Sequence, residues 1–369
     1  MSPAGKASPS IAELLAERIA RDGPVGFDEF MDAALYHPGE GFYMRGDLVS
    51  EHFFTSVSVH PVFAEMLARH LDDVWTALGR PNPFFVVEIG AGDGALASRI
   101  LKLGPEHPWG DALEYIGVEK SPARLAPAAG AGRARLVEDL TDAGRFPTAA
   151  IISNEFFDAI PFKIARRAES GWIEERVGLE RGRPAFVDAP AGEDVVEYAS
   201  AYARGAQIGA RIEVRTGLDS LYRTVAELAP RLTMTSIDYG GPAEETHGPR
   251  LAGGTALAFR RHKASEDLLG EPGRRDLTAH VNFTQLRDLG RRIGLRALGP
   301  IRQSDFLAAL GIGEYLVHLQ GLPEMTVERY AKEREAVFQL VSPEDLGRFR
   351  VLLQYRGVRF PAVRGFGPS

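Results

Sequence analysis

The stretch from Phe84 to Leu101, FFVVEIGAGDGALASRIL, decides the fold. It begins with an apolar run typical of a buried strand, passes through three glycines at alternate positions, and ends with apolar residues at helical spacing. This order predicts a strand, a glycine turn and a helix. Glycine suits such a turn because the backbone takes positive φ values and lets a ligand approach it closely. The following helix start offers unpaired N–H groups to an electron-rich ligand.

Two classes of ligand compete for this turn. A dinucleotide would use Gly90, Gly92 and Ala95 as the three positions of GxGxx(G/A). Glu88 argues against a dinucleotide, because its carboxylate would repel a pyrophosphate. The same carboxylate suits a cationic amine, such as that of S-adenosylmethionine (SAM). An acid, an apolar residue and then glycines at alternate positions, ending at Gly94, resemble motif I of the class I SAM-dependent methyltransferases.

Three further short strands each lead to an acid or an amide. They are Tyr115 to Glu119, Arg135 to Glu138 followed by Asp139, and Ala149 to Ser153 followed by Asn154. Strands that alternate with helices predict a parallel sheet whose ligand lies beyond the carboxyl ends of the strands. We therefore expect Glu88, Glu119, Asp139 and Asn154 to meet in one crevice, with Glu119 accepting hydrogen bonds from both ribose hydroxyls. The structural alternative is a tight turn with a surface Glu88 and a helix-capping Glu119.

Composition limits the possible functions. The chain has 369 residues, a net charge of −7 and no cysteine. A net negative charge disfavours binding to the phosphates of nucleic acid, so we expect no nucleic-acid partner. The absence of cysteine excludes disulfides and thiolate catalysis. No apolar run approaches the ~18 residues of a membrane span, so we expect no membrane partner.

The start of the chain predicts a cytoplasmic protein. The first ten residues are small and polar, and no hydrophobic signal core follows them. Glu13, Glu17 and Asp22 lie within or beside the first predicted helix, which argues against a cleaved organelle presequence.

The remaining elements are predicted from periodicity and turn residues. Helices are expected at Ile11 to Arg21, Phe27 to Leu35, Phe63 to Leu78 and Thr284 to Ile293, an antiparallel meander at Lys163 to Val187, and loops at Gly39 to Val62 and Arg261 to Thr284. The first loop is long and rich in aromatic residues, which favours a functional loop over disorder.

Motifs spread over most of the chain resemble the MidA family of SAM-dependent methyltransferases. The matching stretches are LYHPGEGFY (Leu35 to Tyr43), EIGAGDG, NEFFDAIP (Asn154 to Pro161), SIDYG (Ser236 to Gly240), GTALAFRRH (Gly254 to His262) and DLTAHVNF (Asp276 to Phe283). The resemblance implies an α/β class I methyltransferase of seven strands, Rossmann-like, with a helical cap and an inserted meander. The mitochondrial member of the family is a complex I assembly factor that dimethylates an arginine, which implies arginine methylation here.

The predicted domain division follows from this resemblance. Residues 1–79 are expected to form the helical cap and the loop that covers the cofactor. Residues 80–369 are expected to form the methyltransferase domain, with insertions at about 162–215 and 241–283.

The chain departs from the family in two places. The family usually follows its Thr-Ser pair with Pro-Glu, and then has Gln and Gly near the next helix. Here Thr55 and Ser56 are followed by Val57, Ser58 and Val59, so an acid and an amide are missing. At Asn282 the family usually has aspartate.

Four residues are the predicted catalytic groups. Methyl transfer mainly requires alignment of a nucleophile, and carboxylates beside an arginine or amine acceptor orient the cation and help it lose a proton. Glu155 and Asp158, which follow the fourth strand, are the first choices. Asp238 at another strand end and His280 in DLTAHVNF are the next. The structural alternatives are a surface acid, a helix cap, a turn residue and a packed histidine.

The sequence thus predicts a SAM-dependent methyltransferase that methylates a nitrogen of a protein side chain. The predicted cofactor-binding residues are Thr55, Glu88, Gly90, Gly92, Gly94, Glu119, Asp139, Leu140 and Asn154. Histidines and acids are not spaced as metal ligands, so no metal is expected. The alternatives are an O- or N-methyltransferase for a small molecule and an assembly protein that binds SAM without turnover. A homodimer is possible.

Overall fold

A computed structural model of the chain describes residues 10–45, 56–122, 124, 134–261, 263–359 and 363–366. The chain divides into two compact units, each drawn from three segments. The first comprises Met1–Phe53, Ala159–Gly217 and His247–Ala279, and the second comprises Phe54–Asp158, Leu218–Thr246 and His280–Ser369.

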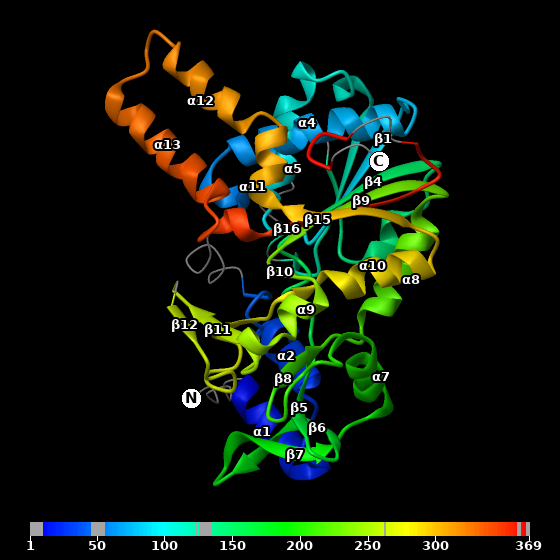
Figure 1. Cartoon of the computed structure of the whole chain (residues 1–369), viewed down its shortest axis with the longest axis vertical. Helices are drawn as coiled ribbons and strands as arrows, with labels where there is room; N and C mark the ends of the chain where they lie inside the picture. The colour runs from blue at the N-terminus through cyan, green and yellow to red at the C-terminus, as the bar shows by residue number, and fades with distance from the viewer. Residues whose placement is uncertain are drawn as a thin grey trace, which may run out of the picture. The chain divides into compact units, whose positions relative to one another are not determined.

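A seven-stranded sheet in the order β15-β16-β9-β4-β1-β2-β3 forms the centre of the second unit (Figure 1). Its strands are β1 Phe84–Ile89, β2 Leu113–Val118, β3 Ala134–Val137, β4 Thr148–Asn154, β9 Arg231–Asp238, β15 Arg296–Arg302 and β16 Arg350–Arg356. β1, β2, β3, β4 and β9 pair in parallel, whereas β16 runs antiparallel to both β9 and β15. The prediction of a seven-stranded, Rossmann-like α/β sheet is confirmed.

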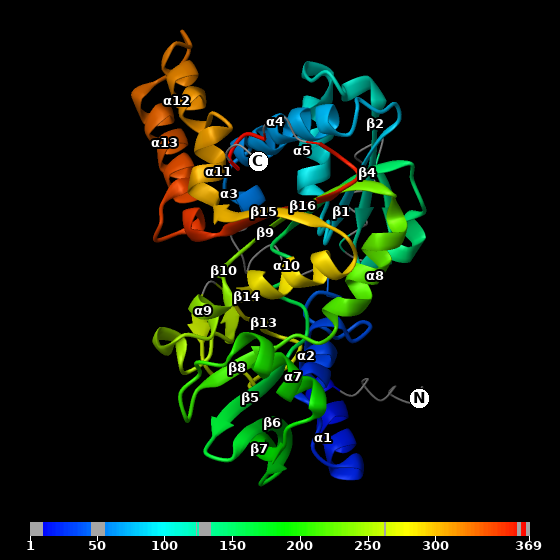
Figure 2. The ribbon, with the colours of Figure 1, turned by 45° about the vertical axis from the view of Figure 1, so that its right-hand side comes forward.

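Helices cover both faces of this sheet (Figure 2). On one side lie α4 Val62–Ala77, α5 Ala95–Leu103 and α11 Gln303–Ala309, and on the other lie α8 Leu218–Leu228 and α10 Phe283–Arg292. Phe63, Ile100 and Phe306 share a hydrophobic core with strand residues such as Val86 and Ile152. Burial of these apolar side chains is the main favourable contribution to the fold of the unit.

Smaller elements complete the second unit. They are α3 Ser56–Val59, η4 Leu140–Ala143, α9 Ala243–Thr246, α12 Ile312–Gln320, α13 Val327–Val341 and the short parallel pair β10 Gly240–Gly241 and β14 Val281–Asn282. Helices α12 and α13 lie side by side beyond α11, in the connection between β15 and β16 (Figures 1 and 2).

The first unit combines two antiparallel sheets with helices. One sheet has the order β7-β6-β5-β8 and the other has the order β12-β11-β13. The elements are α1 Ile11–Asp22, α2 Phe27–Tyr36, β5 Lys163–Ala168, β6 Gly171–Glu180, β7 Arg183–Pro190, α7 Glu193–Tyr202, β8 Arg211–Val214, β11 Leu257–Arg260, β12 Lys263–Ser265 and β13 Asp276–Thr278. Phe27, Phe30, Phe42 and Phe162 are fully buried in its core. The predicted meander from Lys163 to Val187 is confirmed.

The predicted loop from Arg261 to Thr284 is wrong in part, because it contains strands β12, β13 and β14. These strands have only two or three residues each. Such short strands show no measurable alternation of apolar and polar residues, so the sequence does not reveal them.

The expected helices are present with boundaries close to those predicted. Ser10 caps α1 as a capping box, since Glu13 N–H donates to Ser10 Oγ at 3.3 Å and Ser10 N–H donates to Glu13 Oε2 at 2.8 Å. The boundary at residue 79 between a helical cap and a methyltransferase domain stays a prediction. The two compact units describe how the chain packs, and they do not by themselves define functional domains.

Candidate active site at the ends of the sheet strands

The glycine turn joins the end of β1 to the start of α5. Gly90, Gly92 and Gly94 have φ values of 76°, 57° and 73°, a region that residues with a Cβ rarely adopt. A Cβ on Gly90 would lie 2.8 Å from Phe156 Cδ2, and a Cβ on Gly92 would lie 2.7 Å from Arg124 Nη2. The turn therefore needs glycine for its backbone conformation. Gly90 also needs the space beside Phe156, whereas the flexible side chain of Arg124 can move away from a Cβ on Gly92.

Glu88 is buried in β1, with 4% of its surface exposed. Tyr115 Oη donates to its Oε2 at 2.8 Å. Burial raises the pKa of Glu88 to about 8, and the nearby charges of Asp93 and Glu119 add to this effect, while the bond from Tyr115 opposes it. A ligand ammonium group beside Glu88 would favour its ionised form.

Glu119 follows β2 directly and is also buried. Its Oε2 accepts from Gly92 N at 2.9 Å, and its Oε1 accepts from Ser121 N at 3.0 Å. Arg124 Nη1 lies 3.6 Å from Oε2. Glu119 thus fixes the glycine turn, and each carboxylate oxygen has a second lone pair for a ligand hydroxyl.

Asp139 and Leu140 follow β3. Asp139 is the N-cap of η4, and its Oδ1 accepts from both Thr141 N and Thr141 Oγ1 at 2.7 Å. These bonds lower the pKa of Asp139. Leu140 is buried, with 6% of its surface exposed. Thr55, another predicted cofactor contact, lies outside the described residues.

Asn154 ends β4. Its Nδ2 donates to Glu155 Oε1 at 3.0 Å, while its Oδ1 is buried without a hydrogen-bond partner among the described residues. A buried acceptor of this kind is costly unless a ligand donor or a water satisfies it. This orphaned oxygen, the two buried acids and the glycine cradle together fit a ligand with cationic and hydroxyl groups, which SAM has.

The four predicted catalytic groups come together beyond β4 and β9. Asp238, fully buried at the end of β9, accepts at Oδ2 from the N–H groups of Phe156, Phe157 and Asp158, at 3.2, 2.9 and 3.3 Å. Burial and the neighbouring acids Asp158 and Glu155 raise the pKa of Asp238, and the backbone donors oppose this rise. Asp238 therefore holds the turn that carries the other two acids.

Glu155 occupies this turn with an unusual positive φ of 50°. Its Oε1 accepts from Ser56 N at 2.8 Å and from Asn154 Nδ2 at 3.0 Å. Burial raises the pKa of Glu155 to about 7, and the charge of Asp158 also raises it, whereas the bonds from Ser56 and Asn154 lower it. A carboxyl group that titrates near neutrality is suited to accept a proton.

Asp158 and His280 meet through Tyr239. Tyr239 Oη donates to Asp158 Oδ2 at 2.7 Å. The ring of His280 lies edge-on to the ring of Tyr239, with centroids 5.7 Å apart and an angle of 81°. The predicted catalytic residues are therefore neighbours in one network, although their roles stay predictions.

Sequence reasoning missed the roles of Tyr115 and Tyr239. Tyr115 pairs with Val86, and Glu88 lies two residues beyond Val86 on the same face of the sheet. The alternation within the two strands could therefore have suggested that Tyr115 reaches Glu88. No comparable signal exists for Tyr239, because Asp158 comes from a distant segment of the chain.

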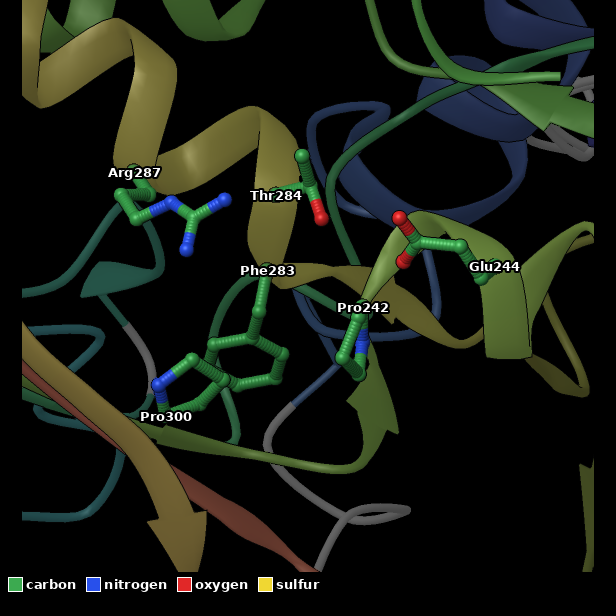
Figure 3. A pocket seen from close by; sticks show the side chains of 6 residues that line it. All are labelled: Pro242, Glu244, Phe283, Thr284, Arg287 and Pro300. Atoms are coloured by element: carbon green, nitrogen blue, oxygen red, sulfur yellow. The ribbon is translucent and has the colours of Figure 1, made fainter. Parts of the chain in front are cut away.

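A separate cavity of about 210 Å³ lies beside the start of α10 (Figure 3). It is lined by Pro242, Glu244, Phe283, Thr284, Arg287 and Pro300. Glu244 and Arg287 extend from different elements around an apolar floor of Phe283 and the prolines (Figure 3). None of the predicted cofactor or catalytic residues lines this cavity, so it is not assigned to either role.

The described residues contain no cluster of His, Asp or Glu side chains that could hold a metal ion. Within the same part of the chain, no helix combines the length and the apolar character needed to cross a membrane.

The strand order with an antiparallel β16, the glycine turn and the acids at the strand ends define a class I SAM-dependent methyltransferase. A family described as S-adenosyl-L-methionine-dependent methyltransferases matches residues 66–301 of the chain. The chain belongs to this family, the MidA family. The predictions of the family, of the enzyme class and of SAM as cofactor are confirmed.

Solved and curated proteins agree with this assignment. A protein of the COG1565 superfamily from Burkholderia thailandensis, solved with S-adenosyl-homocysteine bound, is 28% identical, with a TM-score of 0.84 over 97% of this chain and 94% of that chain. A protein arginine methyltransferase named NDUFAF7 from Xenopus tropicalis is 27% identical over 95% of this chain and 87% of its own length. Its human counterpart is 25% identical over 90% of this chain and 80% of its own length.

The prediction of a cytoplasmic location is contradicted by these relatives, because the frog and human proteins are named as mitochondrial. The prediction relied on composition and on the first residues of the chain. Neither fixes the compartment, since transport signals are short segments that receptors read independently of the fold.

Proposed function

We propose that the chain transfers a methyl group from SAM to a guanidinium nitrogen of an arginine side chain in a protein. The observation that carries this proposal is the pair of acids, Glu155 and Asp158, on one turn beyond β4. The names of the frog and human relatives, which are protein arginine methyltransferases, support arginine as the acceptor.

SAM supplies a methyl group on a positively charged sulfur, which makes the methyl carbon electrophilic. Glu88, Glu119 and the glycine turn would hold the cofactor through its ammonium group, its ribose and its approach to the backbone. Asp139, Leu140 and Asn154 would contact the remainder of the nucleoside or amino-acid parts. These roles rest on the position of each residue at the end of a strand.

The acids of the second turn would bind the acceptor. A guanidinium is planar and presents paired N–H donors, which suit carboxylates held at fixed positions. Asp158, held by Tyr239, would orient this group. Glu155 would accept the proton that the guanidinium nitrogen loses when its bond to the methyl carbon forms and the bond from that carbon to sulfur breaks.

Asp238 and His280 would position these two acids. Asp238 already accepts from four backbone N–H groups, which makes it a positioning residue for the turn. His280 packs against Tyr239 and would limit the movement of the hydroxyl that Asp158 accepts from.

The test is transfer of labelled methyl groups from SAM to a protein extract, followed by hydrolysis and mass spectrometry of the amino acids. We expect methylated arginine in the protein fraction, and none with the Gly92→Arg variant, which blocks the cofactor turn. Label that appears only in small molecules would contradict the proposal. Methylated lysine without methylated arginine would also contradict it.

A further inference from the structure

Helix α3, although only four residues long, contacts both parts of the active site. Ser56 N–H donates to Glu155 Oε1 at 2.8 Å, on the turn that carries the acids. Arg99 of α5, the helix that follows the glycine turn, donates to the carbonyl oxygen of Val57. Ser56 Oγ donates to Gln303 Oε1 at 3.4 Å. The position of α3 therefore determines whether Ser56 donates to Glu155.

The end of α3 is fixed by His60, which has 9% of its surface exposed. Val62 N–H donates to His60 Nδ1 at 3.1 Å, so Nδ1 must be the unprotonated nitrogen. The proton of the neutral ring is then on Nε2, which donates to Glu333 Oε2 of α13 at 2.7 Å. His60 thus connects the segment after α3 to a helix that is far away in the sequence.

Tyr315 of α12 completes this contact. Its Oη donates to the same oxygen, Glu333 Oε2, at 3.0 Å, and its ring lies edge-on to His60 with centroids 5.7 Å apart. Burial and the bond to Glu333 raise the pKa of Tyr315, so its hydroxyl stays protonated and remains a donor at neutral pH. The side chains of His60 and Glu333 are only 11% and 23% exposed, which limits competition from water.

The contacts of His60 with Glu333 and Tyr315 therefore hold the segment between α3 and the start of α4.

We propose that His60, Glu333 and Tyr315 form a positioning cluster for methyl transfer, which anchors α3 so that Ser56 N–H stays bonded to Glu155. This inference rests on the proposed role of Glu155 as the group that accepts the proton. If the anchor is removed, α3 is free to shift, and Glu155 loses a donor that favours its ionised form.

The direction of the effect follows from the groups around Glu155. The carboxyl groups of Asp158 on the same turn and Asp238 at the end of β9 act on it by charge repulsion. Ser56 N–H, Asn154 Nδ2 and the Ser56 side chain are the donors that oppose them. Burial is the largest cause of the raised pKa of Glu155. If the Ser56 bond is lost while Glu155 stays buried, burial and the repulsion remain in place and the pKa of Glu155 rises.

The experiment measures the titration of Glu155 directly and needs no methyl acceptor. The intact protein is labelled with ¹³C at the glutamate carboxyl carbon, and Glu155→Gln identifies the signal that disappears. Spectra are recorded against pH for the wild type, for His60→Ala and for Glu333→Leu, which removes the acceptor of both His60 and Tyr315. The matched control is His318→Ala, which removes an exposed histidine of α12 that has no part in the cluster.

We expect the midpoint of Glu155, near pH 7 in the wild type, to rise by about half a pH unit or more in both cluster variants. The control should keep the wild-type midpoint. Glu333→Leu has a side chain of similar size without the acceptor oxygens, so it provides the result if His60→Ala does not fold.

An unchanged midpoint in folded Glu333→Leu or His60→Ala would overturn the inference. A midpoint that rises in a protein without arginine methylation would sustain the positioning cluster and remove only the proposed function. A failure of the positioning cluster and a failure of the proposed function therefore give different results.

Discussion

The two ends of the proposed active site, one for the cofactor and one for the acceptor, are built in different ways. At the cofactor end, the glycine turn with Glu119 is shaped by the main chain, with three residues at positive φ and an acid that accepts from backbone N–H groups. At the acceptor end, the turn from Glu155 to Asp158 is held by side chains and backbone groups from β9 and α3.

This difference shows which contacts fix the conformation of each turn. A turn built of glycines reaches its conformation through neighbouring residues, and a single residue from outside it, Glu119, accepts a hydrogen bond from its backbone. A turn held by Asp238 and Tyr239 needs a strand paired beside β4, and Glu155 also needs α3. Changes at the cofactor end should therefore affect binding, and changes at the acceptor end should affect the rate.

The largest expected effect is that of Gly92→Arg on cofactor binding. The new side chain would take a φ of 57°, begin 2.7 Å from Arg124 Nη2 and fill the space over the turn. We expect the affinity for S-adenosyl-homocysteine to fall roughly 100-fold or more in calorimetric titration. The control is Gly253→Ala, where a Cβ would meet no atom within 4 Å. An unchanged affinity in Gly92→Arg would remove the glycine turn from the site.

The next effect is that of Glu155→Gln on the rate of methyl transfer. A glutamine keeps the shape of the side chain but cannot accept the proton, so we expect kcat to fall about 100-fold. Affinity for S-adenosyl-homocysteine should change by less than about threefold, because Glu155 lies at the acceptor end. The control is Glu244→Gln, an exposed acid at the separate cavity. A large loss of cofactor affinity in Glu155→Gln would show that Glu155 contributes to cofactor binding, contrary to its proposed role at the acceptor end.

Cofactor binding should depend on pH through Glu88. Its pKa of about 8 means that it is mostly protonated at neutral pH in the free protein, whereas a bound ammonium group favours the carboxylate. Binding then releases a proton, so affinity should rise with pH, by up to about tenfold between pH 6 and 7, and level off above pH 8. Calorimetry in buffers of different ionisation enthalpy measures the number of protons released on binding. The Glu88→Gln variant should bind the cofactor with an affinity that does not depend on pH. A pH dependence that persists in this variant would show that another group releases the proton.

The fold and the cofactor end could be predicted from the sequence to a large extent. The apolar run before Gly90, the glycine spacing and the helical pattern after Gly94 act over short distances, and the parallel strands follow from their alternation with helices. The short strands β12 and β13 could not be predicted, because three residues do not establish a period.

The acceptor end was predicted only as a set of residues. NEFFDAIP and SIDYG identified Glu155, Asp158 and Asp238 as candidates, but not that Asp238 binds the backbone of the turn or that Tyr239 bonds Asp158. These contacts join β4 to β9, which are separated by the whole meander in the sequence. They depend on strand pairing in the folded sheet, and no local pattern encodes such pairing.

The smallest expected effect concerns Asn282, at the start of α10. Asn282 is the N-cap of α10, and its Oδ1 accepts from Thr284 N at 3.0 Å and Gln285 N at 3.2 Å. A carboxylate can accept the same bonds, so Asn282→Asp should change the thermal unfolding midpoint by only about 2 °C and kcat less than about twofold. Asn282→Ala, which loses the cap, should cost about 1 kcal/mol of unfolding free energy. A several-fold gain in rate with Asp would instead show that this position acts on the acceptor end, because capping alone cannot change the chemical step.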